Sequence, residues 1–129
     1  MRLWIDDLRP APAPDGYVWC KSVNEAKDII ARAETRVAEI MEVATNRLNA
    51  LDLRAYQSIL KIASRRDIEL IDIDHDAGDF ACDGGDYIRL LDWLEETGRN
   101  YPIRIHSANA VGVANMRRII ERNGWKEIR

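Results

Sequence analysis

Residues 68–79 have the sequence IELIDIDHDAGD, in which a short apolar run passes directly into acidic residues. The run is apolar on both faces, which is typical of a central strand in a parallel sheet. Asp74, His75 and Asp76 stand where this strand should end. Asp72, one pleat earlier, is interpreted as scaffold that faces a helix. Because open α/β sheets place their binding sites at the carboxyl ends of their strands, the terminal acids are the first candidates for chemistry.

The bulk composition is that of a soluble globular protein. The chain has 129 residues, a net charge of -3 and two cysteines in no metal-binding spacing. A chain of this length forms one domain and buries a core without disulfides, and its charge gives no general attraction to nucleic acid or membrane. No apolar run approaches the roughly 20 residues of a membrane span, and the first residues lack the apolar region of a signal peptide. We therefore expect a single cytoplasmic domain, residues 1–129, with no membrane partner.

Five short segments are rich in strand-forming residues. The first, residues 3–5, stops at Asp6 and Asp7, and a loop with three prolines at alternate positions follows, which forbids a helix there. The other expected strands are residues 17–20, 68–74, 102–106 and 125–128. Helical segments precede the third, fourth and fifth strands, which predicts a mainly parallel α/β sheet.

Helical periodicity accounts for most of the remaining chain. Apolar residues keep one face over residues 23–51, after a capping box formed by Ser22 and Glu25. A second helix is expected over residues 53–64 with Asp52 as its N-cap, so that the two form a helical hairpin. The other helices are expected at residues 87–97 and 115–123, and residues 107–113 are expected to be a turn.

Polar residues follow three of the predicted strands, so they should meet at one edge of the sheet. They are Asp6-Asp7, Asp74-His75-Asp76 and His106-Ser107. Clustered carboxylates repel unless they are protonated or bridged by a cation. An all-oxygen set of this kind suits Mg²⁺, which binds one or two carboxylates together with water and phosphate oxygens. Imidazoles beside such an ion can serve as general acid and base, and Ser107 and Asn109 can hydrogen-bond phosphate oxygens.

These features also have plain structural interpretations. An Asp pair after a strand is often only a turn or a helix cap, and the acids at residues 79, 83 and 86 lie in a glycine-rich loop, where they are usually solvated. The hairpin carries a basic excess that could bind a partner or RNA, although solvated charged faces are the common case. The placement of both histidines of the chain at adjacent strand ends is harder to explain by structure alone.

Three motifs together resemble the cyclic-phosphate processing receiver domain, a divergent relative of the response-regulator receiver. They are Leu-Trp-Ile-Asp-Asp-Leu-Arg-Pro at residues 3–10, Ile-Asp-His-Asp at 73–76 and Ile-His-Ser-Ala-Asn-Ala-Val-Gly at 105–112. The resemblance covers nearly the whole chain except about residues 33–66. It implies a flavodoxin-like, three-layer α/β fold with a mainly parallel five-stranded sheet of order 2-1-3-4-5.

The resemblance also implies roles within a shared acidic pocket. Asp6, Asp7 and Asp74 match the acids that hold Mg²⁺ in receivers. Asp74 also matches the phosphoacceptor, and Ser107 matches the Ser or Thr after the fourth strand. The positions that distinguish this family from ordinary receivers are His75, Asp76, His106 and Asn109, with which we group Arg9.

The chain departs from the receiver pattern in three places. The first receiver helix is replaced by the proline-rich loop, and a helical hairpin of about residues 33–66 is inserted. The lysine that reports phosphorylation in receivers has no clear match, because Lys126 stands near the start of its strand.

The leading hypothesis is a metal-dependent phosphoesterase that acts on a cyclic phosphate, at an RNA end or in a cyclic nucleotide, with Mg²⁺ or Mn²⁺ as cofactor. The predicted catalytic residues are Asp74, His75 and His106, the predicted phosphate ligands are Arg9, Ser107 and Asn109, and the predicted metal ligands are Asp6, Asp7, Asp74 and Asp76. The alternatives are a non-enzymatic signalling domain with Asp74 as phosphoacceptor, and a binding domain for a phosphorylated ligand. The hairpin then offers a surface for a protein partner or a second copy of the chain.

Overall fold

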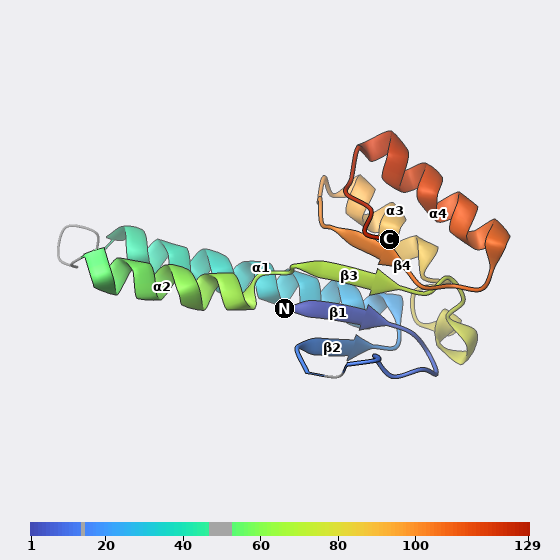
Figure 1. Cartoon of the computed structure of the whole chain (residues 1–129), viewed down its shortest axis with the longest axis horizontal. Coiled ribbons are helices and arrows are strands. Elements are labelled where there is room, and N and C mark those ends of the chain that lie inside the picture. Colours follow the sequence, from blue (N-terminus) through green and yellow to red (C-terminus); the bar gives the residue numbers. More distant parts are fainter. Residues whose placement is uncertain (14, 47–52) are drawn as a thin grey trace.

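Four parallel strands form the sheet at the centre of the structure (Figure 1). The computed structural model describes residues 1–13, 15–46 and 53–129. The strands are β1 (Arg2–Ile5), β2 (Tyr17–Cys20), β3 (Leu70–Ile73) and β4 (Ile103–Ile105), in the order β2-β1-β3-β4. The helices are α1 (Val23–Asn46), α2 (Leu53–Arg66), α3 (Ile88–Glu96) and α4 (Ala110–Asn123), with a 3₁₀ turn, η1, at Gly78–Cys82. Within the described ranges, no helix is long and apolar enough to cross a membrane.

The predicted α/β class, the parallel pairing and the order of the first four strands are confirmed, but the predicted fifth strand is wrong. In place of a strand at residues 125–128, Glu127 makes one isolated bridge to Ile103. The N–H of Ile103 donates to the carbonyl of Lys126 at 2.9 Å, and the N–H of Ile128 donates to the carbonyl of Ile103 at 2.8 Å. Ile103 is the first residue of a very short β4, so this bridge joins the sheet only at that strand's beginning.

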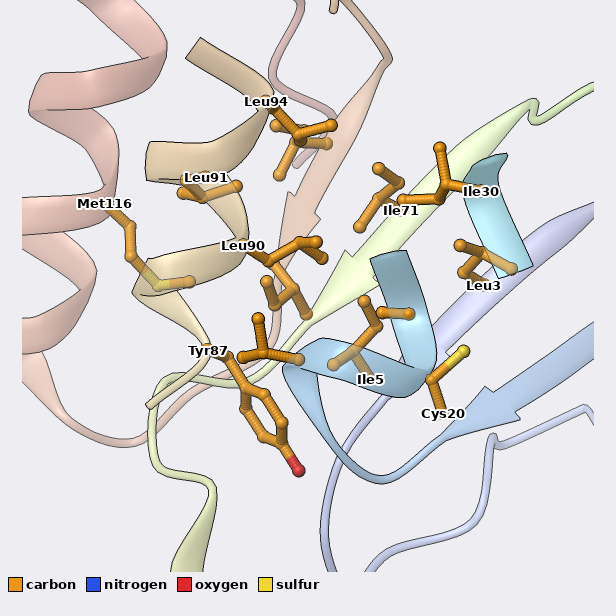
Figure 2. Packing of buried hydrophobic residues seen from close by; sticks show 14 of the residues in the cluster. Leu3, Ile5, Cys20, Ile30, Ile71, Tyr87, Leu90, Leu91, Leu94 and Met116 are labelled. Atoms are coloured by element: carbon orange, nitrogen blue, oxygen red, sulfur yellow. The ribbon is translucent and has the colours of Figure 1, made fainter. Parts of the chain in front are cut away.

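One face of the sheet carries the hydrophobic core (Figure 2). The strand side chains that point into it are Leu3, Ile5, Ile71, Ile73 and Ile103, all fully buried. The helices cover them with Val23, Ala26 and Ile30 of α1, Leu90, Leu91 and Leu94 of α3, and Met116, Ile119 and Ile120 of α4. This packing fixes the sheet and leaves its carboxyl edge free to carry polar groups.

The expected three-layer arrangement is wrong, because no helix of the described chain covers the opposite face of the sheet (Figure 1). Crossovers between parallel strands are right-handed, so the helices that follow β2, β3 and β4 all fall on the same side. A helix between β1 and β2 would have covered the other side. The proline-rich loop stands in that position, and of its residues Pro14 lies outside the described ranges.

The face without helices carries Trp4, Asp72 and Arg104, which are in register on β1, β3 and β4. The expectation that Asp72 faces a helix is therefore wrong. Its side chain is nevertheless only 2% exposed, because its neighbours on the sheet surround it. A carboxylate buried in this way needs partners, and they are described with the site below.

The predicted hairpin is present as α1 and α2, which run side by side and project from the sheet (Figure 1). The predicted capping box begins α1, since the N–H of Glu25 donates to Oγ of Ser22 at 3.0 Å. The Glu25 carboxylate in turn accepts from the N–H of Lys21 at 2.8 Å. The expected N-cap at Asp52 and the expected helical residues 47–51 lie outside the described residues.

The last helix begins earlier than expected. Residues 107–113 were expected to be a turn, but α4 starts at Ala110 with Asn109 as its N-cap. The side-chain oxygen of Asn109 accepts from the N–H of Gly112 at 2.9 Å, which satisfies one of the free donors of the first helical turn. Gly112 favoured a turn in the sequence, yet it is a buried residue inside the helix.

Candidate functional site

The ends of the strands bring three acids together, as predicted. Asp6 and Asp7 follow β1 and Asp74 follows β3, and these two strands are paired in parallel. Each carboxylate has an oxygen that lies within 4.8 Å of an oxygen of the other two. Because parallel strands end at one edge, the topology alone accounts for the cluster.

Of the three acids, Asp6 has the most hydrogen-bond partners, and its side chain is only 1% exposed. One oxygen accepts from the backbone N–H groups of Leu8 and Arg9, at 2.9 and 2.8 Å. The other lies 3.1 Å from Nε of Arg9 and 3.2 Å from Nε2 of His106. Burial alone would raise the pKa of Asp6, but the N–H groups of Arg9 and Leu8, the Arg9 guanidinium and His106 together hold that pKa below its ordinary value.

Arg9 connects the two strand ends. Besides its bond to Asp6, its Nη2 donates to Asp74 at 3.2 Å and to the carbonyl of His106 at 3.4 Å. Two tryptophans fix the loop that carries it, since the indole N–H of Trp4 donates to the carbonyl of Arg9 and that of Trp19 donates to the carbonyl of Asp6, both at 2.6 Å. The Arg9 side chain is 60% exposed, so an anion from solvent can reach it.

Asp7 differs from Asp6, because its carboxylate accepts no hydrogen bond from the described part of the chain. It lies instead against Gly78 of η1, where a Cβ would come within 2.2 Å of Oδ2 of Asp7. Gly78 has φ +54, a backbone conformation that favours glycine. The turn can therefore approach Asp7 closely only because residue 78 has no side chain.

This donor set fits a hard divalent cation. Asp7 has uncommitted oxygens, and Asp74 has one oxygen bonded to the N–H of His75 at 2.7 Å and one shared with Arg9. Mg²⁺ binds one or two carboxylates and fills its other positions with water or phosphate oxygens. The oxygens of Asp6 are saturated, so Asp7 and Asp74 would hold the ion while Asp6 orients Arg9.

His106 lies between two carboxylates on the face without helices. Its Nδ1 is 2.6 Å from Asp72, and its Nε2 is 3.2 Å from Asp6. The ring stacks on Trp4 with 3.8 Å between the ring centroids and 3° between the planes. Asp72 also accepts from Arg104 at 3.4 Å and from the hydroxyl of Tyr17 at 3.5 Å. Both ring nitrogens of His106 therefore face a carboxylate, Nδ1 that of Asp72 and Nε2 that of Asp6.

His75 belongs to a second group of residues, beside α4. Its Nδ1 is 2.8 Å from the carboxylate of Asp76, which holds the pKa of Asp76 below its ordinary value. The side-chain amide of Asn109 donates to both oxygens of Asp76 at 3.3 Å. A Cβ at Gly112 would fall 2.4 Å from the His75 ring, so the close approach of this ring to α4 requires glycine at that position.

The predicted site residues therefore divide into two neighbouring groups. The first contains Asp6, Asp7, Asp74, Arg9 and His106, and the second contains His75, Asp76 and Asn109. Asp76 was predicted as a metal ligand, but the structure groups its carboxylate with His75 and Asn109, outside the three-acid cluster. The hydroxyl of Ser107 accepts from the N–H of Asn109 at 3.2 Å.

Two of the three acids of the glycine-rich loop, Asp83 and Asp86, stabilise the loop instead of joining the cluster. Asp83 accepts from Ser22 at 2.6 Å and from Asn24 at 3.0 Å at the start of α1. Asp86 accepts from the N–H of Ala77 at 3.0 Å. These bonds tie the loop to the end of β3 and thereby support the position of η1 beside Asp7.

Sequence reasoning missed four residues that shape the site: Trp4, Asp72, Gly78 and Gly112. Asp72 carried a usable signal, since a carboxylate within an apolar strand must find partners. The two glycines carried no comparable signal, because a loop glycine and a glycine near a predicted turn are both common.

Comparison with known proteins gives one family match. The family model described as "Cyclic-phosphate processing Receiver domain" matches residues 46–122, which is more than half of the chain. The matched range contains the second group of residues together with Asp74 and His106. It differs from the expected extent, because it includes residues 46–66 and leaves out residues 1–45. Searches among curated proteins and among solved structures gave no match.

Proposed function

Because the chain belongs to the cyclic-phosphate processing receiver domain family, we propose that it is a phosphoesterase that opens a cyclic phosphate, at an RNA end or in a cyclic nucleotide. The observation that carries this proposal is the pairing of an exposed guanidinium, Arg9, with a three-acid cluster and a histidine at one sheet edge. A phosphate ester needs a cationic group to bind its oxygens and proton donors and acceptors to exchange its bonds. This edge of the sheet supplies both.

Asp7 and Asp74 would hold Mg²⁺ or Mn²⁺ in this proposal. When bound there, the ion supplies Lewis-acid polarisation of a phosphoryl oxygen. Arg9 would bind a second oxygen of the same phosphate, because its Nη2 already lies at the Asp74 side of the pocket. Asp6 fixes the direction of that guanidinium through Nε, so the phosphate meets a preset donor instead of a free side chain.

The two histidines would perform the two proton transfers of hydrolysis. A water oxygen attacks phosphorus and gives up a proton, while the ring P–O bond breaks and its oxygen receives one. Nε2 of His106 faces Asp6, on the side of the three-acid cluster, and would donate the proton to the leaving oxygen. His75 has its Nδ1 on Asp76, which leaves its Nε2 to accept the proton of the water. Ser107 and Asn109 would orient the phosphate from the β4 side.

Incubation with a 2′,3′-cyclic nucleotide and either metal tests this proposal. The expected result is conversion to a single 2′- or 3′-monoester, which is lost with Asp74→Ala and with His106→Ala. Asp79→Ala is the matched control, because this exposed acid lies nearby in η1 and its carboxylate has no partner within the described chain. Turnover that is absent in the wild type, or that survives both substitutions, would show that the proposal is wrong.

A second function is a signalling domain in which Asp74 receives a phosphoryl group. The position of Asp74, at the end of β3 beside two acids, favours it. Lys126 cannot play the reporting role of the receiver lysine, because the bridge at Glu127 places it beside Ile103, at the start of β4. Acetyl phosphate followed by intact-mass measurement decides the matter: phosphoryl mass in the wild type that disappears in Asp74→Ala supports signalling, and no added mass excludes it.

A further inference from the structure

Asp72 is a buried carboxylate that the chemistry proposed above does not use. It lies in the middle of β3, two residues before Asp74 and on the same face of the strand. Its side chain is 2% exposed, although it carries a formal charge. Burying such a group is costly unless it is well paired, so its retention inside a sheet calls for a specific partner.

The partner at the shortest distance is His106. Oδ1 of Asp72 lies 2.6 Å from Nδ1 of that ring, and Oδ2 faces Arg104 and Tyr17 at 3.4 and 3.5 Å. A carboxylate oxygen accepts, so Nδ1 must carry the proton of this bond. The contact therefore places a proton on Nδ1, and Nε2 is the nitrogen that faces Asp6, whose carboxylate likewise accepts only from a protonated nitrogen.

The position of the ring is fixed from two further sides. Trp4 stacks on its plane with a centroid distance of 3.8 Å, which prevents tilting. The N–H of His106 donates to the carbonyl of Ile73 at 2.9 Å, which anchors its backbone on β3. Since Trp4, Asp72 and Arg104 occupy one register row, the sheet itself sets the distance between the ring and its acid.

We propose that Asp72 is the positioning residue for His106, which keeps one proton on Nδ1 and so makes Nε2 the nitrogen of this ring that exchanges a proton with the substrate. This inference rests on the proposed function for its catalytic meaning. When the ring P–O bond breaks, the proton moves from Nε2 to the leaving oxygen, and the ring is left neutral with Nδ1–H still bonded to Asp72. Without that bond the neutral ring can place its proton on either nitrogen, and a fraction of molecules has the wrong one.

The first test measures the bond without activity. In protein labelled with ¹⁵N at histidine, a long-range proton–nitrogen correlation shows which ring nitrogen of His106 carries a proton. The chain has two histidines, and the His75→Gln variant assigns their signals. The expected result is a protonated Nδ1 that is protected from solvent exchange. An unprotonated Nδ1 in the wild type overturns the proposal, whether or not the protein turns over any substrate.

The second test uses Asp72→Asn, which keeps the size of the side chain. If the wild type opens the cyclic phosphate, kcat should fall by up to about 10⁴-fold with little change in KM, because Asn in place of the Asp partner of a catalytic histidine favours the wrong tautomer. Arg104→Gln is the matched control, because it changes the other oxygen of Asp72 and should leave kcat and the Nδ1 proton in place. Equal losses in both variants would assign Asp72 a merely structural role.

If Asp72→Asn does not fold, the wild-type nitrogen spectrum and the Arg104→Gln variant still decide the inference. If the wild type shows no turnover, the proposed phosphoesterase function is wrong, but the nitrogen spectrum still shows whether Nδ1 of His106 carries a proton. The two failures are thus separable.

Discussion

The contact between Gly112 and His75 allows a prediction whose sign depends on one neighbouring side chain. A Cβ added at Gly112 would lie 2.4 Å from both Cγ and Cδ2 of His75. Carbon atoms normally rest about 3.5–4.0 Å apart, so one of the two groups must move by more than about 1 Å. Cγ is close to the backbone of His75, and the ring is held by Asp76 at 2.8 Å, so the movement cannot be absorbed at a flexible end.

Gly112→Ala should therefore destabilise the protein. Overpacking of a buried contact costs about 1–3 kcal/mol. The higher helix propensity of Ala relative to Gly offsets at most about 1 kcal/mol of this cost, and less here because Gly112 lies in the first turn of α4. We expect a net loss of up to about 3 kcal/mol in the free energy of unfolding, measured by urea denaturation with an unchanged slope.

The His75→Ala background supplies the decisive comparison. Removing the ring removes the three atoms nearest to the new methyl group, so the helix preference should dominate, and Gly112→Ala should become stabilising by up to about 1 kcal/mol. A sign change between the two backgrounds is the signature of this contact. The reasoning is refuted if Gly112→Ala has the same effect in both backgrounds, or if it stabilises the protein while His75 is present.

Two further predictions concern a metal site and a pH dependence. Gly78→Ala should abolish Mn²⁺ binding, measured by calorimetry, because a Cβ at residue 78 would displace the Asp7 carboxylate. The control is Gly98→Ala, which has a similar φ of +67 and nothing within 4 Å of the added Cβ; it should lower the free energy of unfolding by only about 1 kcal/mol and bind Mn²⁺ normally. Equal Mn²⁺ affinities in the two variants would contradict this prediction. Arg122 and, after it, Asn123 lower the pKa of Glu95 to about 2, below the unfolded value of about 4.3. This carboxylate therefore stabilises the fold above about pH 4.3 and loses its contribution as the pH falls toward 2. Urea denaturation across that window should show a shallower loss of stability in Glu95→Gln, and parallel curves for the two proteins would count against the linkage.

The convergence of Asp6, Asp74 and His106 could be predicted because it follows from topology alone. Parallel strands share a carboxyl edge, so residues that end different strands must meet there once the strand order is known. The strands needed no tertiary information beyond their apolar runs and the helices between them. The same reasoning could not say which residue of an acid pair is free, because that depends on the loop that follows β1.

The contacts of Asp72 and Gly112 could not be predicted from the periodicity of the sequence, because they depend on tertiary packing. Asp72 meets His106 only because β3 and β4 pair in one register, and a slip by one residue would turn either side chain to the other face. Gly112 stands inside a helix because a ring from β3 packs against it, which is a tertiary cause for a residue that locally favours a turn. The missing fifth strand also has a tertiary cause. Residues 125–128 are strand-forming, but the neighbouring strand β4 has only three residues and pairs with them through one isolated bridge.

Charge balance gives the two acids of the Asp6-Asp7 pair different tasks. The three clustered carboxylates carry a formal charge that Arg9 reduces by only one, and Asp6 uses that guanidinium together with two backbone N–H groups. Asp72 does not alter this balance at the pocket, because Arg104 faces its second oxygen. Within the described chain, Asp7 and Asp74 together have only Arg9 as a cationic partner, so their negative charge would repel a phosphate unless a divalent cation bound there. In the function proposed above, Asp7 and Asp74 would hold the ion and Arg9 would bind the phosphate, so we expect the anionic ligand to bind more tightly when a divalent metal is present.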